Sequence, residues 1–199
     1  MKLGICISGQ GTNLRNLVER GFEVVAVATN RPSCGGAAFA RERGLPLAEL
    51  SQRAFATVED RDAAMRDFFI DHGVELVVDA GYDRVHSAPF LEAFGGRIIN
   101  VHPSLLPAFS GGMDAIEQAL AAGVERTGAT VHLVTDRLDA GPILMQQSVP
   151  ILPGDTAETL RQRVHEAEYR LVPAAIRMME ERMHKGSPRT RGEASEFVG

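Results

Sequence analysis

Short runs of consecutive Val, Ile, Leu and Ala residues recur through the first half of the chain, and segments of helical character separate them. Apolar residues at successive rather than alternate positions are typical of strands covered on both faces, as in a parallel sheet with crossover helices. The strands predicted in this way span residues 2–8, 23–30, 75–80 and 97–101, and the helices between them span residues 13–20, 36–44 and 61–72. The sequence therefore predicts an α/β fold with a doubly wound, mostly parallel sheet.

The pattern changes after residue 101. Prolines and glycines between residues 103 and 112 predict a loop, and a short helix is expected at residues 114–122. Strands at residues 129–135 and 142–150 then predict a C-terminal antiparallel pair, followed by a long helix over residues 155–184.

The chain of 199 residues shows no internal repeat and no linker, so we expect one domain over residues 1–184. Residues 185–199 are rich in Gly, Ser, Arg and Glu and are expected to form a flexible tail. Pro173 lies inside the last predicted helix. Because proline removes a main-chain hydrogen bond, we expect a kink or break near Val172.

Composition and charge narrow the class of protein. The chain has 21 Lys and Arg against 26 Asp and Glu, a formal net charge of −5, with 9 Phe, 2 Tyr and no Trp. A mildly acidic chain with few aromatic residues is a poor candidate for binding nucleic acid, and its apolar runs are too short to cross a membrane. The N-terminal residues lack the features of a secretory signal, and Cys6 and Cys34 form neither a disulfide framework nor a metal-ligand spacing. We therefore expect a cytoplasmic protein that acts on a small molecule, without metal, nucleic acid or membrane.

A glycine-rich turn follows the first predicted strand at residues 8–14, SGQGTNL, and leads into a helix. Glycines allow a tight turn and a close approach by a ligand, and the free N–H groups of a helix start attract an anion. No lysine follows as in a P-loop, and Leu14 and Asn30 do not fit a dinucleotide fingerprint. The turn therefore favours a phosphate monoester. The alternative is a simple turn in which Thr12 or Asn13 caps the helix.

Asn100 interrupts an apolar strand, and His102 follows two residues later. Side chains at positions i and i+2 of a strand project to the same face. Both residues lie at the C-terminal end of a predicted parallel strand, where open α/β sheets bind ligands. An amide beside an imidazole can polarise a carbonyl group and stabilise its oxyanion. The alternative is a structural histidine with satisfied hydrogen bonds.

Two side chains later in the chain bear on this pair. Asp139 lies in the turn between the last two strands, and a carboxylate near His102 would stabilise the imidazolium and make it a usable general acid. Its alternative role is that of a turn former. His132 is expected to be structural, with a place in the cavity wall as the alternative.

Four segments together resemble the phosphoribosylglycinamide formyltransferase family. They are residues 8–14, residues 99–107 (INVHPSLLP), residues 128–134 (GATVHLV) and residues 138–143 (LDAGPI). The resemblance runs in order through most of the chain and implies a single Rossmann-like formyltransferase domain. It also implies transfer of a formyl group from the co-substrate 10-formyltetrahydrofolate to the amine of glycinamide ribonucleotide, in de novo purine biosynthesis.

The resemblance implies a role for each matching residue. Asn100 would hydrogen-bond the formyl oxygen, and His102 would stabilise the oxyanion and then protonate the departing folate nitrogen. Asp139 would keep His102 charged and relay a proton from the amine through water. The residues implied to bind the ribonucleotide are Gly11, Thr12 and Asn13 at the phosphate and Glu168 at the ribose. Those implied to bind folate are Arg61 at the glutamate tail, then Asp83, Arg84, Val85, His86, Asn100, Thr135, Asp136, Arg137, Leu138 and Asp139.

The chain departs from the family pattern at the folate side. Asp83 and His86 stand where the family usually has apolar residues, and residues 110–112 (SGG) replace a Pro-Gly pair with one residue more. Three other readings therefore stay open: a hydrolase of 10-formyltetrahydrofolate, a formyltransferase for another amine, and a non-catalytic binder of phosphate or folate. A homodimer is also admissible, because the sequence does not determine the oligomeric state.

Overall fold

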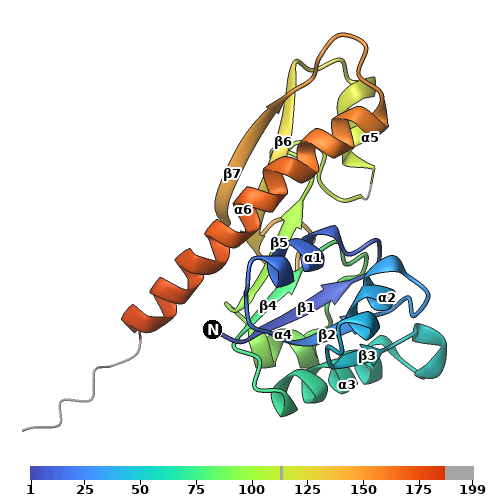
Figure 1. Ribbon diagram of the computed structural model, residues 1–199, viewed down its shortest axis with the longest axis vertical. Helices are drawn as coiled ribbons and strands as arrows, with labels where there is room; N and C mark the ends of the chain where they lie inside the picture. Colours follow the sequence, from blue (N-terminus) through green and yellow to red (C-terminus); the bar gives the residue numbers. More distant parts are fainter. Residues whose placement is uncertain (113, 187–199) are drawn as a thin grey trace, which may run out of the picture.

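The computed structural model describes residues 1–112 and 114–186, which contain one seven-stranded sheet of order β3-β2-β1-β4-β5-β6-β7 (Figure 1). Strands β1 to β5 run parallel, whereas β6 is antiparallel to both β5 and β7. The strands are β1 (Leu3–Ile7), β2 (Val24–Thr29), β3 (Leu47–Glu49), β4 (Leu76–Asp79), β5 (Ile98–His102), β6 (Arg126–Leu133) and β7 (Ile143–Pro150). The predicted doubly wound sheet with a C-terminal antiparallel pair is confirmed.

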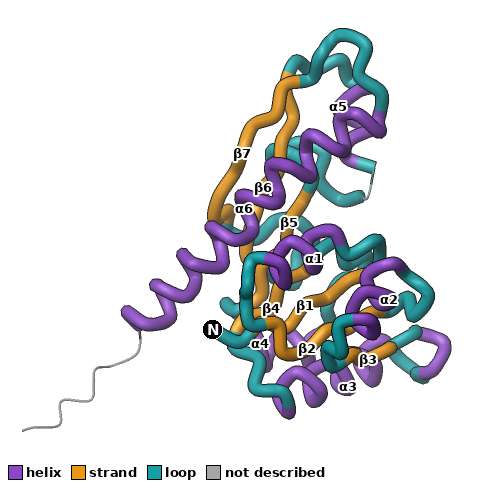
Figure 2. Tube along the Cα trace, in the orientation of Figure 1, coloured by secondary structure: helices purple, strands orange, loops and turns teal. Residues whose placement is uncertain are grey.

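Helices cover both faces of the sheet (Figure 2). They are α1 (Thr12–Glu19), α2 (Gly35–Glu42), α3 (Val58–Asp71), α4 (Ala88–Phe94), α5 (Ala115–Ala121) and α6 (Ala157–Gly186), with the short 3-10 helix η1 (Gln52–Ala54). One hydrophobic core lies under α1, α2 and α6, and a second lies under α3 and α4. In β1, Ile5 and Ile7 face the first core and Cys6 faces the second, so every position is buried. This explains why the strand is apolar without alternation.

Three short elements, β3, η1 and α4, were not predicted. Helix α3 begins three residues before its predicted start, because Thr57 and Asp60 form a reciprocal capping box at its N-terminus. Element bounds otherwise differ from the predicted ones by a few residues.

Of the expected kink or break near Val172, the break is wrong, because α6 continues through Pro173. A proline leaves the carbonyl four residues earlier without its helical donor. That carbonyl belongs to Tyr169, and it accepts a hydrogen bond from Asn16 Nδ2 of α1 at 3.1 Å. A side chain from a neighbouring helix thus replaces the missing main-chain bond, while buried Val172 and Ile176 hold the helix against the core.

The end of α6 also bears on the predicted tail. The helix includes residues 185 and 186, which were assigned to the tail, and residues 187–199 lie outside the part of the chain that the structure describes. Among the described helices, none is both long enough and apolar enough to cross a membrane.

Candidate active site

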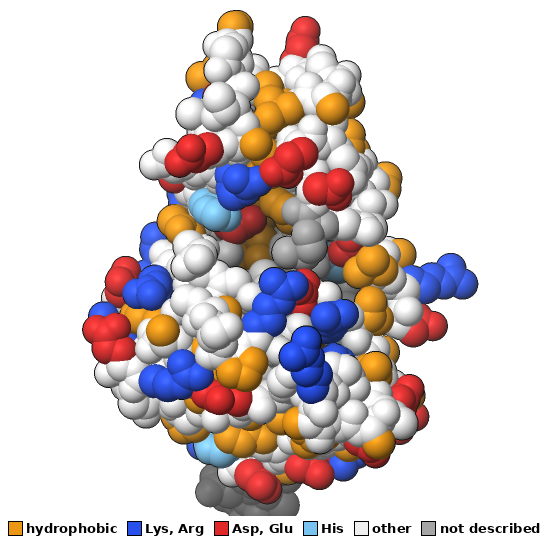
Figure 3. Space-filling model, turned by 90° about the vertical axis from the view of Figure 1, so that its right-hand side faces the viewer, with side chains coloured by type: hydrophobic (Ala, Val, Ile, Leu, Met, Phe, Trp, Pro, Cys, Tyr) orange, Lys and Arg blue, Asp and Glu red, His pale blue; other side chains and the backbone are white. Residues whose placement is uncertain are grey.

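A cavity of about 480 Å³ opens at the carboxyl ends of the parallel strands. Figure 3 shows a hollow between the broad and the narrow half of the molecule, with Lys and Arg side chains on its rim. Its wall combines the glycine turn after β1, the loop after β4, the end of β5, the turn between β6 and β7, and one face of α6. The predicted site residues that line the cavity are Gly11, Thr12, Asn13, Asp83, Arg84, Val85, His86, Asn100, His102, Thr135, Arg137, Leu138, Asp139 and Glu168.

The structure brings Asn100, His102 and Asp139 together at the centre of this cavity. Asn100 and His102 lie two residues apart on β5, as their spacing predicts. Asp139 Oδ2 lies 3.5 Å from Nδ1 of His102, and both side chains are almost wholly buried. The other ring nitrogen of His102, Nε2, lies 2.9 Å from the carbonyl oxygen of Phe109. Both ring nitrogens therefore face acceptors, an arrangement that a doubly protonated imidazolium satisfies.

The turn before β7 places Asp139 by a close backbone approach. A side chain at Gly141 would meet the carbonyl oxygen of Leu133 at 1.8 Å, so only glycine fits there. Asp139 itself has a φ of 52°, in the left-handed region that aspartate tolerates better than most residues. Its carboxylate also accepts a hydrogen bond from the backbone N–H of Gly111 at 2.9 Å.

His132 contacts the same group, which the sequence left open. Its Nε2 lies 3.0 Å from Asn100 Nδ2 and 3.7 Å from Asp139 Oδ1, and its Nδ1 lies 2.9 Å from the carbonyl oxygen of Leu133. Burial lowers the pKa of His132, although the Leu133 carbonyl and the Asp139 carboxylate oppose that effect. The register of the antiparallel strands β5 and β6 places His132 here, because it pairs His132 directly with Asn100.

The glycine turn starts α1 without a side-chain cap. Gly11 is the N-cap residue, with a φ of 71°, so the alternative in which Thr12 or Asn13 caps the helix is wrong. A side chain at Gly11 would also meet the Cα of Gly36 at 2.5 Å. The first N–H groups of α1 therefore face the cavity without an internal side-chain acceptor, as an anion site requires.

Glu168 on α6 closes this end of the cavity. Asn13 Nδ2 donates to Glu168 Oε2 at 2.8 Å, and the Glu168 side chain is buried. Burial raises the pKa of Glu168 to about 7, although the hydrogen bond from Asn13 opposes the shift. Asn13 Oδ1 is also buried and has no hydrogen-bond partner among the described residues, so it can accept from a ligand.

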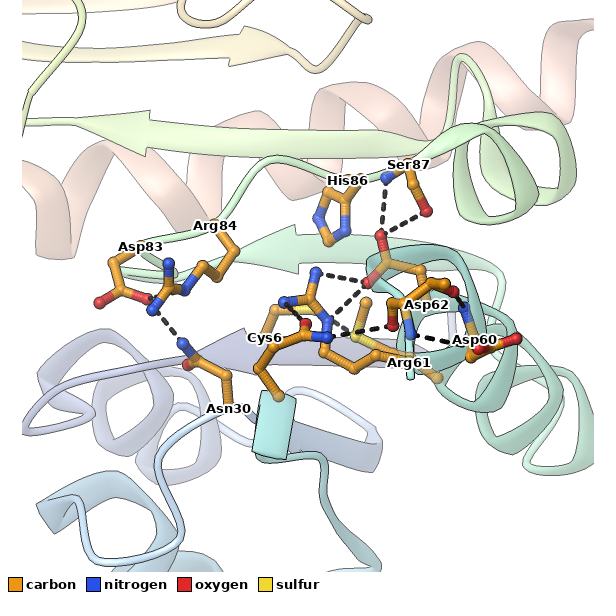
Figure 4. Close-up of polar contacts among 12 residues, drawn as sticks. Cys6, Asn30, Asp60, Arg61, Asp62, Asp83, Arg84, His86 and Ser87 are labelled. Atoms are coloured by element: carbon orange, nitrogen blue, oxygen red, sulfur yellow. Dashed lines mark hydrogen bonds and ion pairs between the residues drawn. The ribbon is translucent and has the colours of Figure 1, made fainter. Parts of the chain in front are cut away.

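The expectation that Arg61 meets a folate tail is wrong. Arg61 is 1% exposed and does not line the cavity. Its Nε and Nη2 donate to Asp62 Oδ1 at 2.9 and 2.7 Å, and Asp62 Oδ2 accepts from the N–H and hydroxyl of Ser87 (Figure 4). The sequence showed only a charged residue on a helix, which ordinarily points to solvent.

Asp136 is the other predicted residue that does not line the cavity. Of the two residues that depart from the family pattern, Asp83 accepts hydrogen bonds from Ser8 and Asn30 and pairs with Arg31 and Arg84. Burial alone would raise the pKa of Asp83, but the hydrogen bonds and the nearby guanidinium groups lower it overall. Asp83 thereby ties the loop after β4 to the ends of β1 and β2.

His86 is packed inward. Its Nε2 lies 3.0 and 2.9 Å from the two carboxylate oxygens of Asp79, and its ring stacks between Tyr82 and Phe90. Its buried Nδ1 has no hydrogen-bond partner among the described residues. Asp79 was missed, although an acidic residue at the end of an apolar strand was a signal for it. Cys6, Asp79 and His86 place ligand atoms within 4.8 Å of one another. Burial and the Asp79 carboxylate raise the pKa of the Cys6 thiol, which opposes the thiolate that a metal would need.

The chain was compared with known proteins. A family model described as formyl transferase matches residues 1–176. Phosphoribosylglycinamide formyltransferase of Mycobacterium tuberculosis is 41% identical over 180 residues, which cover 88% of this chain and 83% of that protein. The Haemophilus influenzae enzyme of the same name is 33% identical over 186 residues, covering 90% of this chain and 87% of that protein.

The chain is also similar to solved structures and to part of a longer protein. Glycinamide ribonucleotide transformylase 1 from Symbiobacterium toebii superposes with a TM-score of 0.86 at 42% identity, covering 92% of this chain and 89% of that one. The trifunctional purine biosynthetic protein adenosine-3 of Gallus gallus is 39% identical over 185 residues, and this chain spans only 18% of its length.

Proposed function

This chain belongs to the formyl transferase family, and we propose that it is a phosphoribosylglycinamide formyltransferase. It transfers the formyl group of 10-formyltetrahydrofolate to the amine of glycinamide ribonucleotide, a step of de novo purine biosynthesis. We place it in the cytoplasm, since both of its cysteines, Cys6 and Cys34, are free thiols, as a reducing compartment favours.

The observation that carries the proposal is the meeting of an amide, an imidazole and a carboxylate at the centre of one cavity. Asn100 and His102 come from β5, whereas Asp139 comes from a distant turn and lies 3.5 Å from His102. One end of the cavity holds the uncapped start of α1, which suits the phosphate of the ribonucleotide. Glu168 and the unpartnered Asn13 Oδ1 lie beside it and suit the ribose hydroxyl groups.

The reaction forms one bond and breaks one. The amine nitrogen attacks the formyl carbon, and the carbonyl oxygen becomes an oxyanion that an N–H of Asn100 and the imidazolium of His102 stabilise. The amine loses a proton through water to Asp139, and His102 protonates the folate nitrogen as its bond to carbon breaks. The proton that Asp139 takes up then returns through water to Nε2 of His102, while Nδ1 keeps its hydrogen toward Asp139, and both groups regain their starting state.

The geometry of His102 supports a choice between its two nitrogens as the one that delivers the proton. Nδ1 is committed to Asp139, so Nε2 is the nitrogen that acts on the substrate. Its present partner, the carbonyl oxygen of Phe109, must therefore be exchanged for the substrate during turnover.

The folate co-substrate occupies the other end of the cavity in this proposal. The loop after β4, including Arg84 and Val85, and the segment around Thr135 to Leu138 form its wall. Because Arg61 is buried, the exposed guanidinium of Arg84 takes the place assigned to it beside the anionic glutamate tail.

The test is a steady-state assay with 10-formyl-5,8-dideazafolate, in which loss of the formyl group is followed spectroscopically with and without glycinamide ribonucleotide. We expect turnover only when the ribonucleotide is present. Turnover without it would identify a hydrolase. Binding of both ligands without turnover would point to another amine acceptor or to a non-catalytic binder.

A further inference from the structure

His132 lies at the base of the cavity, directly opposite Asn100. The two residues are paired across β5 and β6, and the His132 side chain is 2% exposed. Two hydrogen bonds reach its ring, one at each nitrogen. Together they determine which nitrogen carries the proton.

The partner of Nδ1 is the carbonyl oxygen of Leu133, at 2.9 Å. A carbonyl oxygen only accepts, so Nδ1 must carry a hydrogen. Burial lowers the pKa of His132, so the ring is neutral at pH 7 and Nε2 has a free lone pair. The group of Asn100 that faces this lone pair at 3.0 Å must therefore be its NH₂ and not its carbonyl oxygen.

We propose that His132 is a positioning residue for formyl transfer, because its neutral Nδ1–H form holds the Asn100 amide with the NH₂ group toward the reaction centre. This inference rests on the proposed function. One hydrogen of the NH₂ group bonds to His132, and the second is free to meet the formyl oxygen. Without the lone pair the amide can turn by 180° and present its own oxygen, which repels the oxyanion.

The same arrangement gives the two histidines beside Asp139 different roles. Asp139 Oδ2 lies 3.5 Å from Nδ1 of His102, and Asp139 Oδ1 lies 3.7 Å from Nε2 of His132. A neutral His132 with its lone pair at Nε2 has no hydrogen to give Asp139, so the carboxylate charge acts on His102. The charged groups that act on His132 are Asp139 from the turn, His102 from β5 and Asp79 from β4.

The first test reads the ring directly and needs no activity. Nitrogen-15 NMR of the histidine side chains, assigned by loss of one signal pair in His132→Gln, should show His132 as the neutral Nδ1–H tautomer at pH 7 to 8. An imidazolium or an Nε2–H tautomer at pH 7 would overturn the proposal, whatever the enzyme acts on.

The second test uses kinetics. His132→Leu removes the acceptor and should lower kcat roughly 10- to 100-fold, a part of the loss expected for a whole oxyanion donor, with little change in either KM. His132→Gln places an amide oxygen near the position of Nε2 and should recover most of the rate. Thr127→Val, also buried on β6 but away from the cavity, is the matched control and should behave as the wild type.

A double-mutant cycle separates positioning from a structural role. In an Asn100→Ala background His132→Leu should cost less than about 3-fold, because the amide that it orients is gone. An equal loss in both backgrounds, or no recovery with His132→Gln in a protein of unchanged Tm, would contradict the proposal. If the wild type does not use glycinamide ribonucleotide, the proposed function fails while the NMR result still decides the state of His132.

Discussion

Two groups of buried polar side chains flank β4 and β5, and they differ in how fully their members satisfy one another. The open cluster consists of Asn100, His102, His132 and Asp139 and lines the cavity. The closed cluster consists of Arg61 and Asp62 on α3 and Ser87 at the start of α4, and none of the three lines the cavity (Figure 4). Each contains a buried carboxylate beside a nitrogen base.

The two clusters differ in their hydrogen bonds and in the distances between their polar groups. In the closed cluster the Arg61 guanidinium makes two hydrogen bonds to Asp62 Oδ1 and one to Gln52, and Ser87 makes two to Asp62 Oδ2. In the open cluster the imidazole-to-carboxylate distances are 3.5 and 3.7 Å, and polar hydrogens remain for a substrate. A buried carboxylate paired with a base is thus no evidence of catalysis by itself. Partners left unsatisfied toward a cavity are the informative feature.

The largest effect should come from the open cluster. Asp139→Asn removes the charge that stabilises the His102 imidazolium and should lower kcat roughly 10³-fold, about 4 kcal/mol, while the KM for glycinamide ribonucleotide stays within about 3-fold. Steady-state kinetics and a thermal melt of the same preparation check both parts. An unchanged kcat would remove Asp139 from the mechanism.

Substitutions in the closed cluster should change the stability of the protein and leave kcat unchanged. Asp62→Asn leaves the buried Arg61 guanidinium without its counter-charge and should lower the free energy of unfolding by about 3 kcal/mol, with kcat per folded molecule unchanged. Urea unfolding and active-site titration measure the two quantities. The double change Arg61→Met with Asp62→Asn is the control and should recover stability, since it removes both charges and keeps an acceptor oxygen for Ser87. A drop in kcat without a loss of stability would place this cluster in the reaction.

Glu168 lies between these extremes, since it is buried but has one side-chain partner, Asn13. Its folded pKa of about 7 lies above the ordinary value of 4.5, so its contribution to stability is fully present below pH 4.5 and is lost as the pH rises through 7. Between pH 5.5 and 7.5 the free energy of unfolding should therefore fall by about 2 kcal/mol more in the wild type than in Glu168→Gln. Urea titrations at both pH values test this, and equal slopes in the two proteins would show that Glu168 does not titrate in this range.

The smallest effect is expected at Asp83. Asp83→Asn removes a negative charge beside Arg31 and Arg84 and should lower the KM for the anionic folate about 2- to 5-fold at low salt, with kcat unchanged. The gain should fade in 0.5 M salt. Asp71→Asn, at the end of α3 and away from the cavity, is the matched control. A weaker affinity for folate would mean that Asp83 matters as an anchor of its loop more than as a charge.

Much of the fold follows from local patterns. The strands of the parallel half are apolar at successive positions because both of their faces are covered, and this shows in each run by itself. The pairing of Asn100 with His102 on one face is equally local, because it depends only on the two-residue period of a strand. β3 and η1 were not predicted, because three residues are too few to show a periodicity.

By itself, then, the sequence determined the α/β sheet, the glycine turn and the Asn100–His102 pair, since each depends on residues that are neighbours along the chain. Only the tertiary structure decided that Asp139 and His132 reach the same centre, that Arg61 is buried, and that α6 passes through Pro173. These outcomes depend on sheet register and on contacts between residues far apart in sequence, such as Asn16 with Tyr169. The physical reason is that local dihedral preferences act over a few residues, whereas a buried polar group takes whichever distant partner the packing supplies.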